Sequence, residues 1–484
     1  MYKSFTGWVK SGVWVKLAST KKPQPKNHVL TMPKKNKKTR KSKKECRRKI
    51  KKIGITTNCL SSQAGLAPFV NFINGTGICD ELAQVFKDLR KSKKGIELEE
   101  AFLQLVLFFA DGRESSLNTF DTLKENEAWQ KLLGCEVALG TAALKRILHK
   151  AYTVDVEMIR PLIRRVFLSA LKAKNPNKVI LFLDSSVYDN DGAKCRAGVK
   201  CTYKKKEGYH PINLIWDGMY IDTYFQSGHC STNHDGVAIE MLQEIVPMIR
   251  ENLGEDMQVI VRMDGGYYDQ KIFAACDELK INFICAGKRY SDHKIHANTK
   301  LENFDGVYRK KACTWHYLTF QERRKSWPKE MAYRALFLRP TEENGEALLG
   351  LESRIILTNL DVKSCSDQEI IDYDHSRGAD ELTHRAAKDF ASERMPCLDF
   401  HANSLWYSMG IVSFNLFQIF KRNIAGFSWN CYPTTVRRKL FDLAGKIINK
   451  GRSLTLKITS WKMRELKFDQ IWEKSLTPWV LPVL

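Results

Sequence analysis

Two acidic residues stand where the sequence could hold a metal ion. Asp184 ends the apolar run KVILFLD at 178–184, and Asp264 ends a second apolar run, QVIVRMD, at 258–264. Continuous apolar runs of this length predict buried strands, and ligand sites in open α/β sheets lie at the carboxyl ends of strands. One strand-end Asp alone is more often a turn former. Two in matching contexts favour a divalent cation.

A third carboxylate, Glu381, lies in a segment with a helical pattern at residues 377–390. On a helix with 100° per residue, four polar residues share an arc of about 60°: Arg377, Glu381, His384 and Lys388. Apolar residues occupy the opposite side, so the helix can pack on protein and present its polar arc to a polyanion. A solvent-facing helix with ordinary ion pairs, such as Glu381 to Arg385, is the alternative.

Three converging carboxylates could hold two Mg²⁺ ions about 3.5–4 Å apart around a scissile phosphate. Mg²⁺ prefers hard oxygen ligands, and Mn²⁺ can take its place. Asp184 would bridge both ions, while Asp264 and Glu381 would each hold one. Other carboxylates rank behind these three as ligands: Asp380, Asp189 and Asp191.

The elements that must position these residues form an α/β pattern at residues 173–290. After the first strand come a hairpin at 211–225 with Asp217-Gly218 as its turn, a helix at 235–252, the second strand, a helix at 268–279 and a strand at 282–287. This order predicts a mixed sheet. Short strands at 291–358 predict a β-rich insertion, and helical patterns return at 359–425 around Glu381.

Helical patterns also precede the sheet, at residues 56–172. The segment 97–112 predicts a buried helix, and a later helix carries Lys145 and Arg146. Short helices with a basic last member fit a module that binds DNA ends, although a helical scaffold with a charged face is equally compatible. Residues 426–484 predict a basic, helical C-terminal region.

The net charge of +24 is concentrated at the N-terminus. Residues 1–52 contain 19 Lys and Arg against one acid, Glu45, which leaves about +6 for the rest of the chain. A disordered basic arm at residues 1–55 favours a polyanionic partner, namely DNA. A solvated tail without a partner is the alternative. The true start could lie at Met32, at the head of the densest basic run.

The cysteines and the apolar segments exclude other classes of protein. The 13 cysteines include no CxxC pair, so neither a disulfide framework nor a zinc ribbon is expected, and the thiols suit a reducing cytosol. No secretory signal is visible. The most apolar stretch, at 405–420, is too short and too polar for a membrane span, so we expect a buried helix and a cytoplasmic protein.

The sequence resembles bacterial insertion-sequence DDE transposases of the group with a Tyr-Arg-Glu-Lys signature. In that signature three residues separate Arg from Glu and six separate Glu from Lys, as they do at Arg377, Glu381 and Lys388. Tyr373 departs from the signature, because three residues rather than two separate it from Arg377. The motifs DSS near GYHPI and DGGYY also match, and the resemblance covers roughly residues 80–460.

The resemblance implies an RNase H-like core that cleaves the ends of a mobile element and transfers the strands into target DNA. Asp184 and Asp264 would lie on adjacent strands and Glu381 on a later helix. The 117 residues between Asp264 and Glu381 leave room for the inserted β segment. Pairing two DNA ends implies a homodimer in the DNA complex, within the bacterial nucleoid.

Roles in DNA contact also follow from the resemblance. Tyr373, Arg377 and Lys388, with His384 on the same arc, would contact phosphates at the terminal inverted repeats. Trp315 or Trp327 would stack on a flipped base, although packing in the core is the more common role of such a residue. Two rival interpretations remain: another RNase H-like nuclease, such as a resolvase, and an inactive relative that binds terminal repeats.

Overall fold

The structure, a computed structural model, describes residue 50 and residues 52–92, 94–293, 296, 298–310, 313–341, 352–391, 393 and 395–482. The chain falls into two compact units, Met1–Thr57 and Asn58–Leu484. The fold described below is that of the second unit. The predicted basic arm, residues 1–55, lies almost wholly outside the described residues.

A mixed sheet is the centre of the second unit. Among the described residues it contains nine strands, in the order β7 (Met219–Tyr224), β6 (Ile212–Trp216), β2 (Lys178–Ser185), β8 (Gln258–Met263), β9 (Asn282–Ala286), β13 (Arg354–Thr358), β12 (Tyr333–Thr341), β11 (Cys313–Glu322) and β10 (Gly306–Lys310). β2, β8 and β9 are parallel, and the other neighbours are antiparallel. The predicted mixed α/β class is confirmed.

The predicted hairpin forms β6 and β7. Asp217 and Gly218 both have positive φ, 50° and 74°, as the favoured two-residue hairpin turns require. The turn sets the register in which Trp216 pairs with Met219. Because β6 also pairs with β2, this turn fixes the sheet on one side of Asp184.

The predicted β-rich insertion extends the core sheet. β13 pairs with β9, with Ile356 opposite Ala286 and Thr358 opposite Ile284, and β12, β11 and β10 follow outward. Without β13, β9 would be an exposed edge strand, which proteins usually cover. The inserted strands therefore share hydrogen bonds with the core, whereas the sequence predicted a subdomain of their own.

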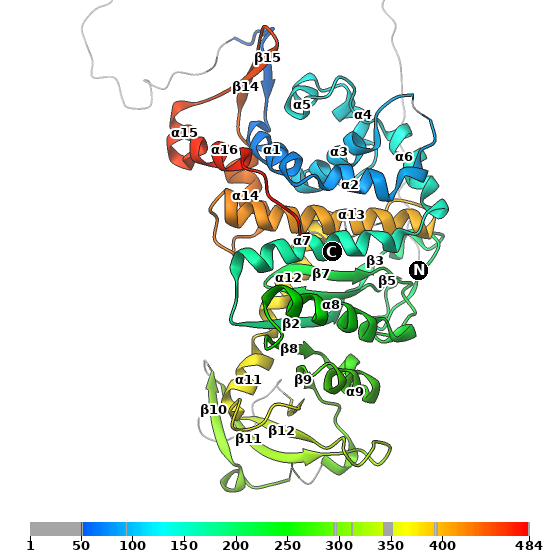
Figure 1. The fold of residues 1–484 in the computed structure, drawn as a ribbon, viewed down its shortest axis with the longest axis vertical. Helices are drawn as coiled ribbons and strands as arrows, with labels where there is room; N and C mark the ends of the chain where they lie inside the picture. The colour runs from blue at the N-terminus through cyan, green and yellow to red at the C-terminus, as the bar shows by residue number, and fades with distance from the viewer. Residues whose placement is uncertain are drawn as a thin grey trace, which may run out of the picture. The chain divides into compact units, whose positions relative to one another are not determined.

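Helices cover both faces of the sheet (Figure 1). One face packs against α7 (Ile159–Lys174), α8 (Val237–Leu253) and α9 (Gln270–Glu278). The other face meets α12 (Arg377–Ala391) and α13 (Phe400–Ile419), while α11 (Asp367–His375) lies beside the inserted strands. α8 and α9 lie where the sequence predicts helices.

Buried along almost its whole length, α13 lies between α7 and the N-terminal helices (Figure 1). They are α1 (Ala67–Thr76), α2 (Ile78–Val85), α3 (Leu98–Asp111), α4 (Thr119–Lys124), α5 (Glu127–Leu133) and α6 (Thr141–His149). The burial of α13 confirms the buried helix predicted at 405–420. None of the described helices is both long and apolar enough to cross a membrane, and the described cysteines are free.

The C-terminal region differs from the predicted helical one. It contains a hairpin, β14 (Gly445–Lys450) and β15 (Ser453–Ile458), before the short helices α15 (Ser460–Leu466) and α16 (Phe468–Leu476); another short helix, α14 (Pro433–Val436), precedes it. Gly451, with φ +63°, makes the turn. β14 also pairs with β1 (Cys59–Ser61), so the start of the second unit joins the C-terminal hairpin in one small sheet.

Candidate active site

The register of two parallel strands brings Asp184 and Asp264 together. Leu183 in β2 pairs with Met263 in β8, and each aspartate comes next along its chain. Adjacent strands lie about 4.8 Å apart, so the two carboxyl groups are close neighbours. Phe182 and Arg262 lie two residues before the aspartates and contact α12. Because residues two apart in a strand point to the same face, both carboxylates lie on the α12 face of the sheet.

The two carboxylates repel each other. The pKa of Asp264 is raised, first by burial and second by the negative charge of Asp184, and the backbone N–H of Gly266, 2.8 Å from Asp264 Oδ1, opposes this rise. Asp184 accepts a 2.8 Å hydrogen bond from the backbone N–H of Ser185. No Lys or Arg in the described part of the chain forms an ion pair with either carboxylate. Two hard oxygen ligands that form no ion pair with Lys or Arg among the described residues fit a divalent metal ion.

His384 lies against Asp184 instead of facing solvent. The residue is 8% exposed, its Nε2 lies 3.3 Å from Asp184 Oδ2, and its Nδ1 lies 2.9 Å from the hydroxyl of Tyr220. The sequence predicted that His384 contacts DNA, whereas here its side chain is turned inward. A DNA contact by His384 stays a prediction. Here the residue lies in contact with a carboxylate of the candidate site.

Glu381 is not part of the carboxylate cluster in this conformation. It is exposed on α12, and no group of three His, Cys, Asp or Glu side chains within the described ranges could hold a metal ion. Its neighbours on the helix face do reach the aspartates: Arg377 lowers the pKa of Asp264, and His384 contacts Asp184. Glu381 lies between them on the helix, four residues after the first and three before the second, and its side chain is exposed.

The alternative carboxylates already have cationic partners. Asp380 pairs with Arg262, and burial raises the pKa of Asp380 in spite of that guanidinium. Asp191 and Asp189 both lie near Lys206, at 3.1 and 3.6 Å from its Nζ. These partners make all three weaker candidates as metal ligands.

The remaining residues of the signature are spread along the sheet. Arg377 lies 3.6 Å from Asp374 and over the ring of Phe182. Lys388 donates to the backbone oxygen of Val187, 2.7 Å away.

Tyr373 accepts a hydrogen bond from Lys178 at the start of β2. Its backbone oxygen accepts a 3.2 Å hydrogen bond from Arg262, two residues before Asp264. The Tyr373 side chain therefore points to the start of β2, six residues before Asp184, while Arg377 lies near enough to Asp264 to act on its pKa.

Both predicted stacking residues are buried. Trp315 is 6% exposed and its ring centre lies 5.1 Å from that of His375. Trp327 is 8% exposed and packs against Tyr268, Phe273 and Tyr333. This geometry fits the alternative role in core packing, and a role in base stacking stays a prediction that would require exposure.

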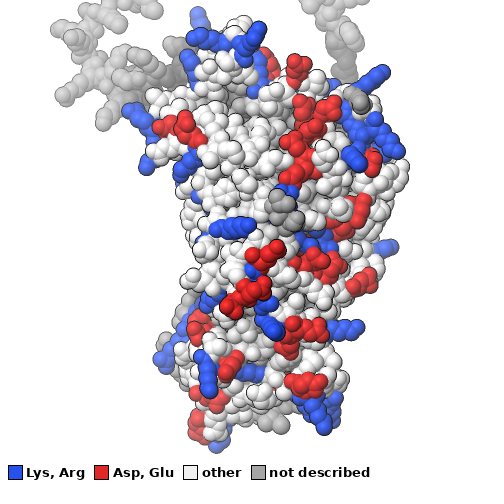
Figure 2. Space-filling model, in the orientation of Figure 1, with Lys and Arg blue, Asp and Glu red and all other residues white. Residues whose placement is uncertain are grey.

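Lys145 and Arg146 are exposed on α6. They line a groove of about 640 Å³ together with Arg90, Lys91, Lys94, His149 and Lys150, and its described lining contains no acidic residue. Figure 2 shows basic side chains gathered over α6, whereas charges of both signs are mixed over most of the same face. The groove suits a polyanion.

Sequence reasoning missed two residues beside the carboxylates, His210 and Tyr203. His210 Nε2 lies 2.8 Å from the Ser185 hydroxyl oxygen, and its Nδ1 lies 3.0 Å from the backbone oxygen of Cys230. Burial lowers the pKa of His210, which keeps the ring neutral. The GYHPI motif contained the signal, but only the fold shows that this histidine meets Ser185, the residue after Asp184.

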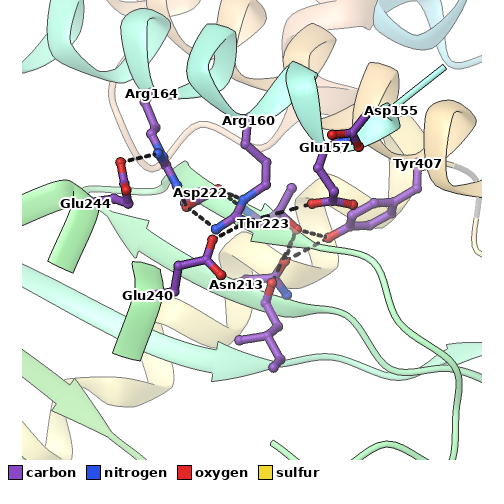
Figure 3. Close-up of polar contacts among 11 residues, drawn as sticks. Asp155, Glu157, Arg160, Arg164, Asn213, Asp222, Thr223, Glu240, Glu244 and Tyr407 are labelled. Carbon is purple, nitrogen blue, oxygen red and sulfur yellow. Dashed lines mark hydrogen bonds and ion pairs between the residues drawn. The ribbon is translucent and has the colours of Figure 1, made fainter. Parts of the chain in front are cut away.

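A second polar cluster lies on the opposite face of the sheet (Figure 3). Asp222 in β7 is fully buried and accepts hydrogen bonds from Arg160 and Arg164 of α7, at 2.6–3.1 Å. Glu240 and Glu244 of α8 each bind one of these guanidinium groups. The cluster ties α7 and α8 to the edge strand and leaves no cation unpaired.

The order of β7, β6, β2, β8 and β9, with aspartates at the ends of two adjacent parallel strands, is consistent with an RNase H-like transposase core. Residues 44–474 match the family model described as Transposase DDE domain group 1. The chain belongs to this family of DDE transposases, which implies DNA cleavage and strand transfer.

Among solved structures, the chain is similar to a piggyBac transposase, seen in a cryo-EM structure of its synaptic complex with hairpin DNA. The identity is 11% and the TM-score 0.40, over 88% of this chain and 86% of that one. No curated protein matches the chain.

Proposed function

We propose that the protein cleaves DNA at the ends of a bacterial insertion sequence and joins those ends to target DNA. The observation that carries the proposal is the pair of aspartates at the ends of β2 and β8 in a member of the DDE family. Their charges have no Lys or Arg partner among the described residues. A pair of this kind needs a cation, and a phosphodiester substrate needs one as well.

Asp184 and Asp264 would hold the metal ions, and Glu381 would complete the ligand set from α12. Bound Mg²⁺, or Mn²⁺ in its place, supplies the Lewis acid that activates the attacking hydroxyl and stabilises the leaving oxygen. His384 lies against Asp184, with its Nε2 3.3 Å from Oδ2, and its Nδ1 hydrogen-bonds with the hydroxyl of Tyr220. Glu381 is exposed and has no ion-pair partner among the described residues, so rotation of its side chain meets little resistance.

The partners would be the terminal inverted repeats and the target DNA. Arg377 would contact phosphates near the carboxylates, and Lys388 would do so after release from Val187. Lys145 and Arg146, in the basic groove of α6, would bind the repeat further from the cleavage point. Holding two ends together implies a homodimer in the complex, and binding to DNA implies a place at the nucleoid.

Cleavage of end-labelled terminal-repeat DNA in the presence of Mg²⁺ tests the proposal. We expect Asp184→Asn to lower the rate by about a thousandfold or more, since several kcal/mol of metal stabilisation are lost. Metal-free binding of the repeat should persist. Wild-type protein that binds the repeat but never cleaves it, in Mg²⁺ or Mn²⁺, would contradict the proposed activity.

Substitutions at two neighbouring carboxylates on α12, Glu381 and Asp380, test which of them is the third metal ligand. Glu381→Gln should lower cleavage as strongly as Asp184→Asn. Asp380→Asn should cost stability through its Arg262 partner, yet lower cleavage by the folded protein less than about tenfold. The reverse pattern would transfer the ligand role to Asp380 and leave the proposed activity intact.

A second candidate is a terminal-repeat binding protein without catalysis. It is favoured by one observation, namely that no three-ligand metal group is formed within the described part of the chain. The cleavage assay separates the two candidates. Binding without cleavage, both in the wild type and in Asp184→Asn, would establish this alternative.

A further inference from the structure

A small hairpin stands beside the two aspartates. β4 (Lys200–Cys201) and β5 (Glu207–Tyr209) pair with each other, and β3 (Tyr188–Asp189) completes the sheet. Its loop is closed by backbone hydrogen bonds from Thr202 to Lys206 at 2.8 Å and from Lys205 to Thr202 at 2.9 Å. The loop therefore has a defined shape, and Tyr203, Lys204 and Lys205 form its tip.

The base of the hairpin is packed tightly against the core. A Cβ atom on Gly208 would lie 2.0 Å from the backbone oxygen of Tyr188, so only glycine allows this approach. The Tyr209 hydroxyl donates to the backbone oxygen of Ala197 at 2.8 Å and accepts from Asn403 of α13 at 2.9 Å. These contacts fix the position of the tip relative to the sheet.

The tip reaches the candidate active site through His210. The ring centres of Tyr203 and His210 are 5.0 Å apart, and His210 lies 2.8 Å from the Ser185 hydroxyl, next to Asp184. Burial and the charges of Asp184 and Asp264 raise the pKa of Tyr203 to about 12, so its hydroxyl stays protonated. Nevertheless Tyr203 is 63% exposed, which leaves ring surface open toward solvent beside the carboxylates.

The lysines of the loop differ in their partners. Lys206 is occupied by Asp191 and Asp189. Lys204 and Lys205 are exposed and have no acidic partner among the described residues. Lys204 Nζ lies 5.5 Å from the centre of the Tyr203 ring. An exposed aromatic ring between a carboxylate pair and two unpaired cations is suited to a nucleotide, whose base stacks while its phosphates are neutralised.

We propose that the tip Tyr203–Lys205 binds the nucleotide next to the scissile phosphate. Tyr203 stacks on its base, and Lys204 and Lys205 contact the flanking phosphates. This inference rests on the proposed function, and it assigns the stacking role to a residue of the core hairpin in place of Trp315 or Trp327. A protein partner at the tip, or a hydrogen bond from the Tyr203 hydroxyl to a phosphate, are the competing explanations that the experiment must separate.

The test uses the full chain and a duplex of the terminal repeat that flanks the gene, with 2-aminopurine at the base beside the cleavage point. Binding is measured without divalent metal, so that no cleavage occurs. We expect the wild type and Tyr203→Phe to change the fluorescence equally, because the stacking ring is kept. Tyr203→Ala should lose the change and bind about tenfold more weakly, as the loss of one base stack implies.

Trp461→Ala is the matched control, since Trp461 is also an exposed aromatic residue, at 58%, with a lysine over its ring. It should leave the fluorescence change intact. Lys204→Ala and Lys205→Ala should each reduce the salt dependence of binding by about one counterion. Circular dichroism should show that all these variants fold, because the altered side chains are exposed.

Two results would overturn the inference. An unchanged fluorescence signal in Tyr203→Ala would show that no base stacks there. A Tyr203→Phe variant as defective as Tyr203→Ala would show that the hydroxyl, and not the ring, makes the contact. Both results are compatible with Mg²⁺-dependent cleavage by the wild type. If instead the wild type neither bound nor cleaved the repeat, the proposed function itself would be contradicted.

Discussion

The sheet carries acidic groups on both faces, buried on one face and half-buried on the other, and their surroundings differ in charge. On the α7 face, Asp222 is fully buried between the guanidinium groups of Arg160 and Arg164. On the α12 face, no Lys or Arg among the described residues forms an ion pair with Asp184 or Asp264; Asp184 lies beside His384, and Asp264 accepts from the backbone N–H of Gly266. The acid that stabilises the fold is paired with arginines of the same chain. The acids proposed to act in catalysis have no such ion pair, so a bound metal ion would have to neutralise them.

The largest effect that this comparison predicts is on stability. Asp222→Asn leaves two buried guanidinium groups without their carboxylate, and breaking a buried pair typically costs about 3–5 kcal/mol. Urea denaturation monitored by circular dichroism measures the free energy of unfolding.

Asp184→Asn provides the contrast on the other face. It removes a charge that repels Asp264, so it should cost little or nothing. If Asp184→Asn destabilised the protein as much as Asp222→Asn, the distinction between the two faces would fail.

A smaller effect concerns added metal. If the α12 face lacks a cation, Mg²⁺ should stabilise the wild-type fold, by about 1.4 kcal/mol at ten times its dissociation constant. Asp184→Asn and Asp264→Asn should lose this gain, whereas Asp222→Asn should keep it despite its lower stability. Thermal unfolding with and without MgCl₂ gives the measurement. An equal gain in all four proteins would mean that Mg²⁺ binds elsewhere.

The sequence was informative where the structure depends on local pattern. The apolar runs that end at Asp184 and Asp264 predicted two buried strands, and the Asp217-Gly218 turn predicted their antiparallel neighbour. Contacts between distant segments were not predictable in the same way. Nothing local to β9 indicates that β13 covers it, or that His210 meets Ser185.

His384 shows a second limit of sequence reasoning. A helical wheel identified a polar arc on α12, and the natural expectation was that a polar arc faces solvent or DNA. The structure turns part of that arc inward: His384 Nδ1 hydrogen-bonds with the hydroxyl of Tyr220, and Nε2 lies 3.3 Å from Asp184 Oδ2. Periodicity identifies which residues share a face, but it does not reveal whether that face meets water or other polar side chains.

The smallest predicted effect is a pH dependence confined to the α7 face. Glu157 lies 3.8 Å from Arg160 at the edge of the Asp222 cluster (Figure 3). Its pKa is raised from 4.5 to about 7, first by burial; Arg160 opposes the rise, and the charges of Asp222, Asp155 and Glu240 add to it. The folded protein therefore takes up a proton at a higher pH than the unfolded chain does. As pH rises from about 4.5 through about 7, ionisation of Glu157 therefore lowers the free energy of unfolding, and the fold stays less stable above that range.

Glu157→Gln should remove this contribution, since glutamine does not titrate. The unfolding free energy of the wild type, relative to that of Glu157→Gln, should fall between pH 5 and pH 8. Because 36% of the side chain is exposed, solvent screens the interaction and the change should stay below about 1 kcal/mol. Denaturation curves of both proteins across this range give the difference, in which contributions from other titrating groups cancel. A difference that rises with pH would contradict this prediction. It would mean that Arg160 stabilises the Glu157 carboxylate more than burial and the neighbouring acids destabilise it.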